Sequence, residues 1–263
     1  MISNLLFHLI LLAYLLASLM FWLHLSLRQH WLFQMACGLL MSGFGLQTGL
    51  LGFLLYTQRF LVRDNIAASM ALLSWAIVAV YVVALWRYRI AALGSFVVPL
   101  AFVAAAYAGV PVMVETPLLP VLHYLWLGMH VVLALLGYAA LTLTFCAGVM
   151  YLMQERQLKS KRPGGLYHRL PSLRLLDEVN ARALVLGFPL LTQGIITGSV
   201  WAKYMYGSYL QWNLTSLPIL LTWLIYGFLL GGRHTLGWQG KKAAVAAVGG
   251  FGVVVASYFV HTL

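Results

Sequence analysis

The fold class of this chain is decided by the stretch GFPLLTQGIITGSVWA, residues 187–202. It carries no charged residue, and glycine, serine and alanine recur among its apolar side chains. An apolar run rich in small residues is typical of a helix inside a membrane protein. The run leads directly into residues 203–214, which hold three tyrosines and a tryptophan. Such residues gather where a helix leaves the bilayer, so we expect a membrane helix followed by an aromatic loop.

The composition of the whole chain supports this interpretation. Of its 263 residues, 63% are hydrophobic and 8% are charged, whereas soluble domains carry about 25% charged residues. Repeated apolar runs of about 20 residues predict an all-α polytopic membrane protein, because helices satisfy their own backbone groups in lipid. We attribute the net charge of +11 to membrane topology and exclude nucleic acid as a partner.

The sequence predicts a single membrane domain over residues 1–263 with about eight transmembrane helices. They are expected at about 2–25, 31–57, 66–86, 90–112, 120–153, 183–202, 215–231 and 243–262. The fifth is longer than a bilayer core, so it should tilt or extend beyond the lipid.

Basic residues predict the orientation of these helices. Thirteen of the sixteen lysines and arginines fall on one side: Arg28, Arg87, Arg89, Arg156, Lys159, Lys161, Arg162, Arg169, Arg174, Arg182, Arg233, Lys241 and Lys242. Only Arg59, Arg63 and Lys203 fall on the other. Cytoplasmic loops carry the excess of lysine and arginine, so both termini and the aromatic loop 203–214 are expected outside, on the periplasmic side.

The loop 154–182 is the only long cytoplasmic connection in this arrangement, and it is basic. Leu173, Leu176 and Val179 recur in it at helical spacing, which predicts an amphipathic helix on the inner membrane surface. Basic segments of this kind attract anionic lipid headgroups or a cytoplasmic partner.

Histidines are the first candidates for a binding site, because ionisable groups in a membrane are costly and imidazole is a frequent axial ligand of haem iron. His130 lies two to three turns into its predicted helix, and His123 lies roughly on the same face. His261 ends the last helix on the same outer side and is a candidate second axial ligand. On the inner side the candidates are His234 and His24. The alternative for His130 is a hydrogen bond to a neighbouring helix.

Aromatic side chains and one lysine form the second candidate group: Trp201, Tyr206, Tyr209, Trp212 and Lys203. A flat porphyrin gains burial and stacking on such a surface, and the lysine could pair with a propionate. The alternative is an ordinary aromatic belt at the membrane interface.

Polar residues in the second apolar run raise a further possibility. Gln47 and Thr48 would line a cavity in a small-solute transporter, but they could equally form hydrogen bonds between helices. No Asp or Glu falls at mid-membrane in this arrangement, which weighs against an ion-coupled transporter.

Four ordered blocks resemble the CcsA-type cytochrome c assembly family and its relatives HemX and YpjD. They lie at residues 64–75, 129–140, 186–212 and 221–226. In the family the second block surrounds a histidine that ligates haem at the outer face, and His130 matches that histidine. The resemblance implies haem b as the cofactor, and haem together with other membrane subunits of an assembly complex as partners. It implies a bacterial inner-membrane location and a haem-handling protein of cytochrome c maturation type, an assembly factor rather than a stand-alone enzyme.

The chain departs from the family in the aromatic segment. Asn213 and Leu214 follow Trp212 where the family has aspartate and proline, and Tyr206 replaces a tryptophan. These differences favour the HemX and YpjD branch. The alternative function is therefore a non-haem regulatory or scaffold membrane subunit that docks a partner through the basic loop 154–182.

Overall fold

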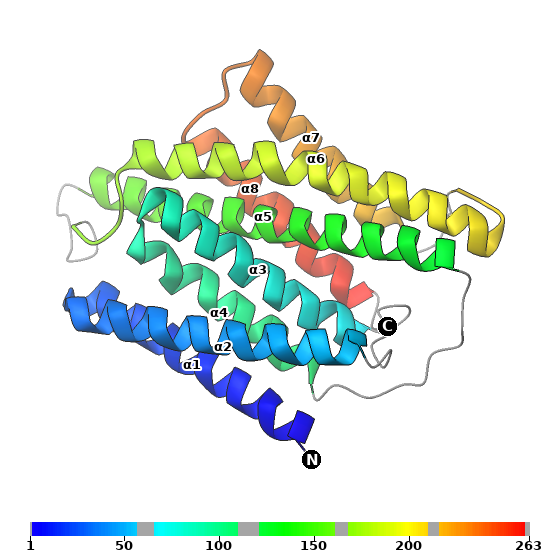
Figure 1. Ribbon diagram of the computed structural model, residues 1–263. Coiled ribbons are helices and arrows are strands. Elements are labelled where there is room, and N and C mark those ends of the chain that lie inside the picture. Colours follow the sequence, from blue (N-terminus) through cyan, green and yellow to red (C-terminus); the bar gives the residue numbers. More distant parts are fainter. Residues whose placement is uncertain (1, 57–65, 110–120, 161–167, 210–215, 261–263) are drawn as a thin grey trace. The chain divides into compact units, whose positions relative to one another are not determined.

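The structure is a computed structural model that describes residues 2–56, 66–109, 121–160, 168–209 and 216–260 (Figure 1). Its regular structure within those ranges is entirely α-helical. The helices are α1 (Ile2–Leu27), α2 (His30–Tyr56), α3 (Ile66–Tyr88), α4 (Ala91–Ala108), α5 (Val121–Lys159), α6 (Leu173–Tyr206), α7 (Ser216–Thr235) and α8 (Lys241–Val260).

Length and composition make six of these helices, α1 to α6, candidates to cross a membrane. The prediction of an all-α polytopic membrane protein is thereby confirmed. The side on which the termini lie, and the crossing of the membrane by α7 and α8, stay predictions.

The connection between α5 and α6 is shorter than the predicted loop 154–182. α5 continues to Lys159, and α6 begins after Ser172, whose hydroxyl accepts a hydrogen bond from the Leu175 backbone N–H at 3.4 Å. Leu176 and Val179, expected on a separate surface helix, are buried in the first turns of α6. Their apolar face packs inside the protein, so it does not lie on the membrane surface as expected.

The chain forms two compact units, residues 1–118 and residues 119–263. Two packed units can belong to one membrane domain, so the single domain expected over residues 1–263 stays a prediction. In the first unit α1 contacts α2 and α4, and α3 contacts the same two helices. The first unit is therefore a closed ring of four helices.

Two tight turns in the first unit place arginines at one end of the ring. Arg28 and Arg89 follow α1 and α3 with φ values of 57° and 54°, a left-handed conformation that ends a helix. The Ser95 hydroxyl, at the start of α4, donates to the Phe21 carbonyl near the end of α1 at 2.9 Å. Both turns therefore lie at the same end, in agreement with the arginine positions used to predict the orientation.

Gln47 joins three helices of the first unit. Its Oε1 accepts a hydrogen bond from the Tyr14 hydroxyl at 2.6 Å, and its Nε2 donates to the Ala71 carbonyl at 3.0 Å. α2 runs unbroken through this position. The polar pair seen in the sequence therefore includes an interhelical hydrogen-bonding residue, and the second of the two alternatives holds for Gln47.

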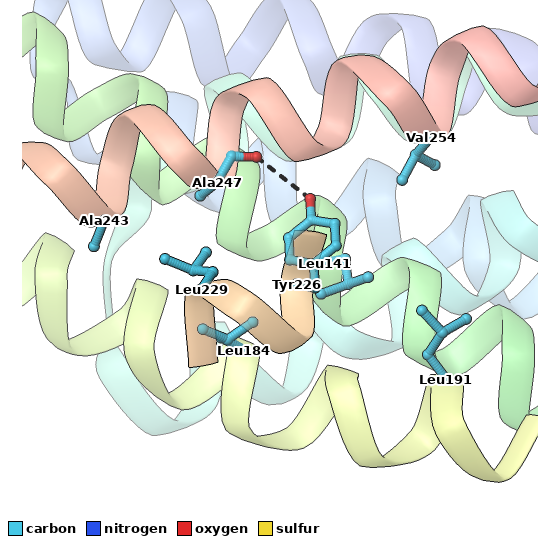
Figure 2. Packing of buried hydrophobic residues seen from close by; sticks show 8 residues of the cluster. All are labelled: Leu141, Leu184, Leu191, Tyr226, Leu229, Ala243, Ala247 and Val254. Atoms are coloured by element: carbon cyan, nitrogen blue, oxygen red, sulfur yellow. Dashed lines mark hydrogen bonds between the residues drawn. The ribbon is translucent and has the colours of Figure 1, made fainter. Parts of the chain in front are cut away.

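The second unit contains α5 to α8. Its buried core comprises Leu141, Leu184, Leu191, Tyr226, Leu229, Ala243, Ala247 and Val254 (Figure 2). The Tyr226 hydroxyl donates to the Ala247 carbonyl at 3.3 Å, which satisfies the polar end of a fully buried ring (Figure 2). Residues of all four helices thus meet in one core.

α5 and α6 lie side by side along most of their length (Figure 1). Their contact is close because small residues face each other. A Cβ on Gly137 would lie 2.8 Å from the Leu191 backbone N, and one on Gly194 would lie 2.9 Å from the Ala134 backbone. As residue numbers rise along α5 they fall along α6, so the two helices are antiparallel.

Candidate functional site

His130 lies at the contact between α5 and α6. Because α5 begins at Val121, the histidine stands about two and a half turns from the start of the helix. Its Nδ1 lies 2.7 Å from the carbonyl oxygen of Gly194 on α6. The interhelical hydrogen bond, which was the alternative to haem ligation, is therefore present, but it occupies only one of the two ring nitrogens.

The chemistry of this hydrogen bond defines the protonation of the ring. A carbonyl oxygen only accepts, so Nδ1 must donate, and the neutral imidazole then carries an unprotonated Nε2. No described residue forms a hydrogen bond with Nε2. A histidine held in this way offers a lone pair to a metal.

α6 approaches the ring through glycine. The three atoms nearest to a Cβ built on Gly198 all belong to His130, the first being Nδ1 at 2.5 Å. By contrast, a Cβ on Gly128, two residues before His130 in α5, meets nothing within 4 Å. The close approach to His130 comes from Gly198 on α6, 68 residues away in sequence, so the residues around His130 could not predict it.

The aromatic candidates gather at the C-terminal end of α6. The rings of Trp201 and Tyr206 meet edge to face, with centroids 5.8 Å apart. The Trp201 Nε1 is buried without a hydrogen-bond partner among the described residues. Tyr206 and Tyr209 are exposed. Because α5 and α6 are antiparallel, this end of α6 lies at the same end of the pair as His130.

Lys203 caps the same helix end. Its Nζ donates to the Gly207 carbonyl at 2.8 Å and lies 5.2 Å from the centroid of the Tyr209 ring. Gly207 closes α6 in the left-handed conformation, with φ of 76°, and its N–H donates to the Lys203 carbonyl at 3.0 Å. The ammonium group therefore already contacts one acceptor and one aromatic ring. Its remaining N–H bonds are available for a second acceptor.

Several predicted site residues cannot be placed against this group. His261 and Trp212 lie outside the described residues, and His123 falls in the first turn of α5, where only the backbone is described. Their roles stay predictions.

The two histidines predicted for the inner face have different surroundings. The His24 Nδ1 lies 3.0 Å from the Gln29 carbonyl, and the ring tilts against Phe33 at 5.4 Å between centroids. His234 is exposed in the last turn of α7. Neither is brought against a second histidine of its own unit by any contact in the described structure.

A polar cluster at the other end of the α5–α6 pair escaped the sequence analysis. Arg233 Nη2 donates to Asp177 Oδ1 at 2.9 Å and to Asn180 Oδ1 at 2.7 Å. The Gly240 N–H donates to the same Asp177 oxygen at 3.0 Å, and Asn180 Nδ2 donates to the Thr144 carbonyl at 2.7 Å. The cluster thus joins all four helices of the second unit. The sequence could have indicated this cluster, because Asp177 and Arg233 are charged residues next to apolar segments.

The residues at the His130 end of the α5–α6 pair suit a haem group. His130 Nε2 is an unprotonated nitrogen of the kind that ligates haem iron. Trp201 offers a buried indole N–H that no described residue accepts, and two exposed tyrosines continue the aromatic surface. Lys203 belongs to the same group, and its positive charge suits a carboxylate such as a haem propionate.

Fold and candidate site together define a class: a polytopic helical membrane protein in which two antiparallel helices hold a histidine with a free Nε2 near an aromatic helix end. The chain belongs to the Cytochrome C assembly protein family, whose profile matches residues 64–263. The family inferred from the four sequence blocks is therefore confirmed.

Individual relatives are similar over about three-quarters of the chain. A cytochrome c biogenesis protein CcsA from Microcystis aeruginosa is 32% identical, with 74% of each chain covered. The CcsA protein of a Synechococcus strain is 33% identical, over 74% of this chain and 73% of its own. That of Mesostigma viride is 31% identical, over 84% and 80%.

Proposed function

We propose that this protein serves cytochrome c biogenesis by binding haem b at the outer end of the α5–α6 pair and presenting it there. Membership of the cytochrome c assembly family supports the biogenesis role and haem handling in general. One observation carries the finer proposal: the Nδ1–H of His130 is committed to the Gly194 carbonyl at 2.7 Å, which leaves Nε2 for iron.

The surrounding side chains have distinct roles in this proposal. His130 binds the iron, while Trp201, Tyr206 and Tyr209 supply a surface for the porphyrin face. The Lys203 ammonium group donates one of its other N–H bonds to a haem propionate. A bound haem supplies the porphyrin and iron that cytochrome c maturation requires. His261 would supply a second ligand to the iron, with His123 as the alternative on the outer side.

The proposed location is a bacterial inner membrane, with the haem site on the periplasmic side. The distribution of lysine and arginine supports this orientation, because the inner ends carry thirteen of the sixteen basic residues. The protein would work with another membrane subunit, and the step that forms thioether bonds would be supplied elsewhere.

The visible spectrum of the full-length protein, purified in detergent and supplied with haem, tests the proposal. We expect a sharp Soret band with α and β bands on reduction, and we expect His130→Ala to lose or shift them. His168→Ala, in the basic connection, is the control and should leave the spectrum unchanged.

A colourless protein after haem is supplied, or an unchanged spectrum in His130→Ala, would contradict the proposal. The colourless outcome would favour a regulatory or scaffold subunit, and binding of anionic vesicles through the basic segment 154–182 would then be the property to measure.

A further inference from the structure

We propose that α6 positions the iron ligand: the Gly194 carbonyl selects the tautomer of His130, and the missing side chain of Gly198 sets the place of its ring. This inference rests on the proposed function, because it takes His130 Nε2 as the nitrogen that meets haem iron. It adds two positioning residues that do not themselves touch the haem.

The first part concerns the proton on the ring. The Gly194 carbonyl accepts from His130 Nδ1 at 2.7 Å and, at 3.0 Å, shares the single proton of the Thr197 hydroxyl with the Gln193 carbonyl at 2.8 Å. Both donors approach an oxygen that has no proton to give, so the ring must carry its hydrogen on Nδ1. Hydrogen bonds of this kind orient metal-binding histidines and raise their basicity.

The second part concerns the position of the ring. The nearest atoms to a Cβ on Gly198 would be Nδ1 at 2.5 Å, Cε1 at 2.7 Å and Cγ at 3.2 Å, all in His130. Such separations are too short for carbon against a ring, so any side chain at 198 must displace the imidazole. Displacement would take Nδ1 away from the Gly194 carbonyl and free both nitrogens to exchange the proton.

Gly198 differs from the other glycines of α6 in what it touches. A Cβ on Gly194 would meet the Ala134 backbone at 2.9 Å, and one on Gly187 would meet the Ala140 Cβ at 3.0 Å. Those two glycines set the separation of the helices, whereas Gly198 faces the ligand ring. α6 also carries Trp201 at its next turn, so a single helix positions both the iron ligand and part of the aromatic surface.

The first experiment measures the tautomer without haem. Full-length, haem-free protein labelled with 15N-histidine is examined in bilayers by solid-state NMR, and the His130 signals are assigned by their loss in His130→Gln. We expect a protonated Nδ1 and an unprotonated Nε2. A protonated Nε2 in the wild-type protein would overturn the inference, whether or not any variant folds.

The second experiment compares haem affinity among matched glycine variants. Gly198→Ala should bind haem about 10–100-fold more weakly, the usual effect of losing a group that orients a metal ligand, and its His130 should show a mixture of tautomers. Gly187→Ala strains the same helix contact away from the histidine, and Gly128→Ala lies in open space on α5. Both controls should keep the wild-type affinity to within a few-fold and keep the tautomer.

The outcomes separate this inference from the proposed function. If His130→Gln binds haem as the wild type does, the ligand assignment fails. If His130→Gln loses haem while Gly198→Ala keeps both affinity and tautomer, only the positioning role fails. Equal losses in Gly198→Ala and Gly187→Ala would assign the effect to helix packing and would also overturn it.

Discussion

At the scale of single residues, polar side chains in the apolar helices mark the places where helices touch. Gln47 bonds to two other helices, Asn180 bonds to the α5 backbone, and His130 bonds to the α6 backbone. An unsatisfied polar group is costly in lipid, so such residues are retained where a partner exists. The sequence identifies these residues as unusual, but their partners lie on other helices.

Arg233 provides the first test at this scale. The side chains of Arg233 and Asp177 are 9% and 22% exposed, and removing one member of a buried pair leaves the other without compensation. We expect Arg233→Met to lower the free energy of unfolding by about 3 kcal/mol, measured as a lower unfolding midpoint in detergent.

A surface ion pair serves as the control for this prediction. Arg182 and Glu178 form a pair on α6 at 2.7 Å, with side chains 48% and 41% exposed. Arg182→Met should change stability by no more than about 0.5 kcal/mol, because water screens exposed pairs. Similar effects of the two substitutions would show that the cluster around Arg233 does not hold the four helices together.

At the scale of elements, the α5–α6 pair is the framework of the candidate site. Gly137, Gly187 and Gly194 allow the two backbones to approach, which is the usual way that membrane helices associate without a hydrophobic driving force. The same close contact brings the Gly194 carbonyl within reach of His130. Gly194 therefore serves both the packing of the pair and the geometry of the histidine, whereas Gly137 and Gly187 serve the packing alone.

We expect Gly137→Ala to destabilise the second unit, because its Cβ would stand 2.8 Å from the Leu191 backbone N, where only a helix shift gives room. Overpacking of this kind costs about 1–3 kcal/mol. Gly128→Ala on the same helix has open space and should be neutral or stabilising by up to about 1 kcal/mol. Thermal unfolding in detergent measures both, and equal midpoints would contradict close packing at Gly137.

At the scale of the whole molecule, orientation in the membrane is the property to test. α6 has 34 residues and is roughly 50 Å long, enough for its two ends to reach opposite sides of a bilayer. The basic residues predict that the end following Tyr206 lies outside and the end before Ser172 lies inside.

Cysteine labelling in intact cells checks this orientation. In a background of Cys37→Ala and Cys146→Ala, Ser208→Cys should react with an impermeant maleimide added outside, and Arg169→Cys should react only after the membrane is opened. The reverse pattern would invert the topology. Labelling of both from one side would mean that α6 does not cross.

Much of the architecture follows from local sequence. All the helices except α6, which begins ten residues before its predicted start, lie close to the predicted ranges, because hydropathy depends on residues within about 20 positions. The prediction failed around Leu176 and Val179, whose apolar spacing suits a membrane surface and a protein core equally well. Only the position of the neighbouring helices distinguishes those two outcomes.

The sequence alone determined the membrane class, the helices, the family resemblance and His130 as the leading histidine, since each depends on residue type and short-range order. Tertiary structure supplied the hydrogen-bond partner of His130 Nδ1, because Gly194 lies 64 residues away on α6. It also decided that Gly198, and not the neighbouring Gly128, approaches the ring. Contacts between helices depend on which faces meet, and that arrangement is a property of the packed chain rather than of any one segment.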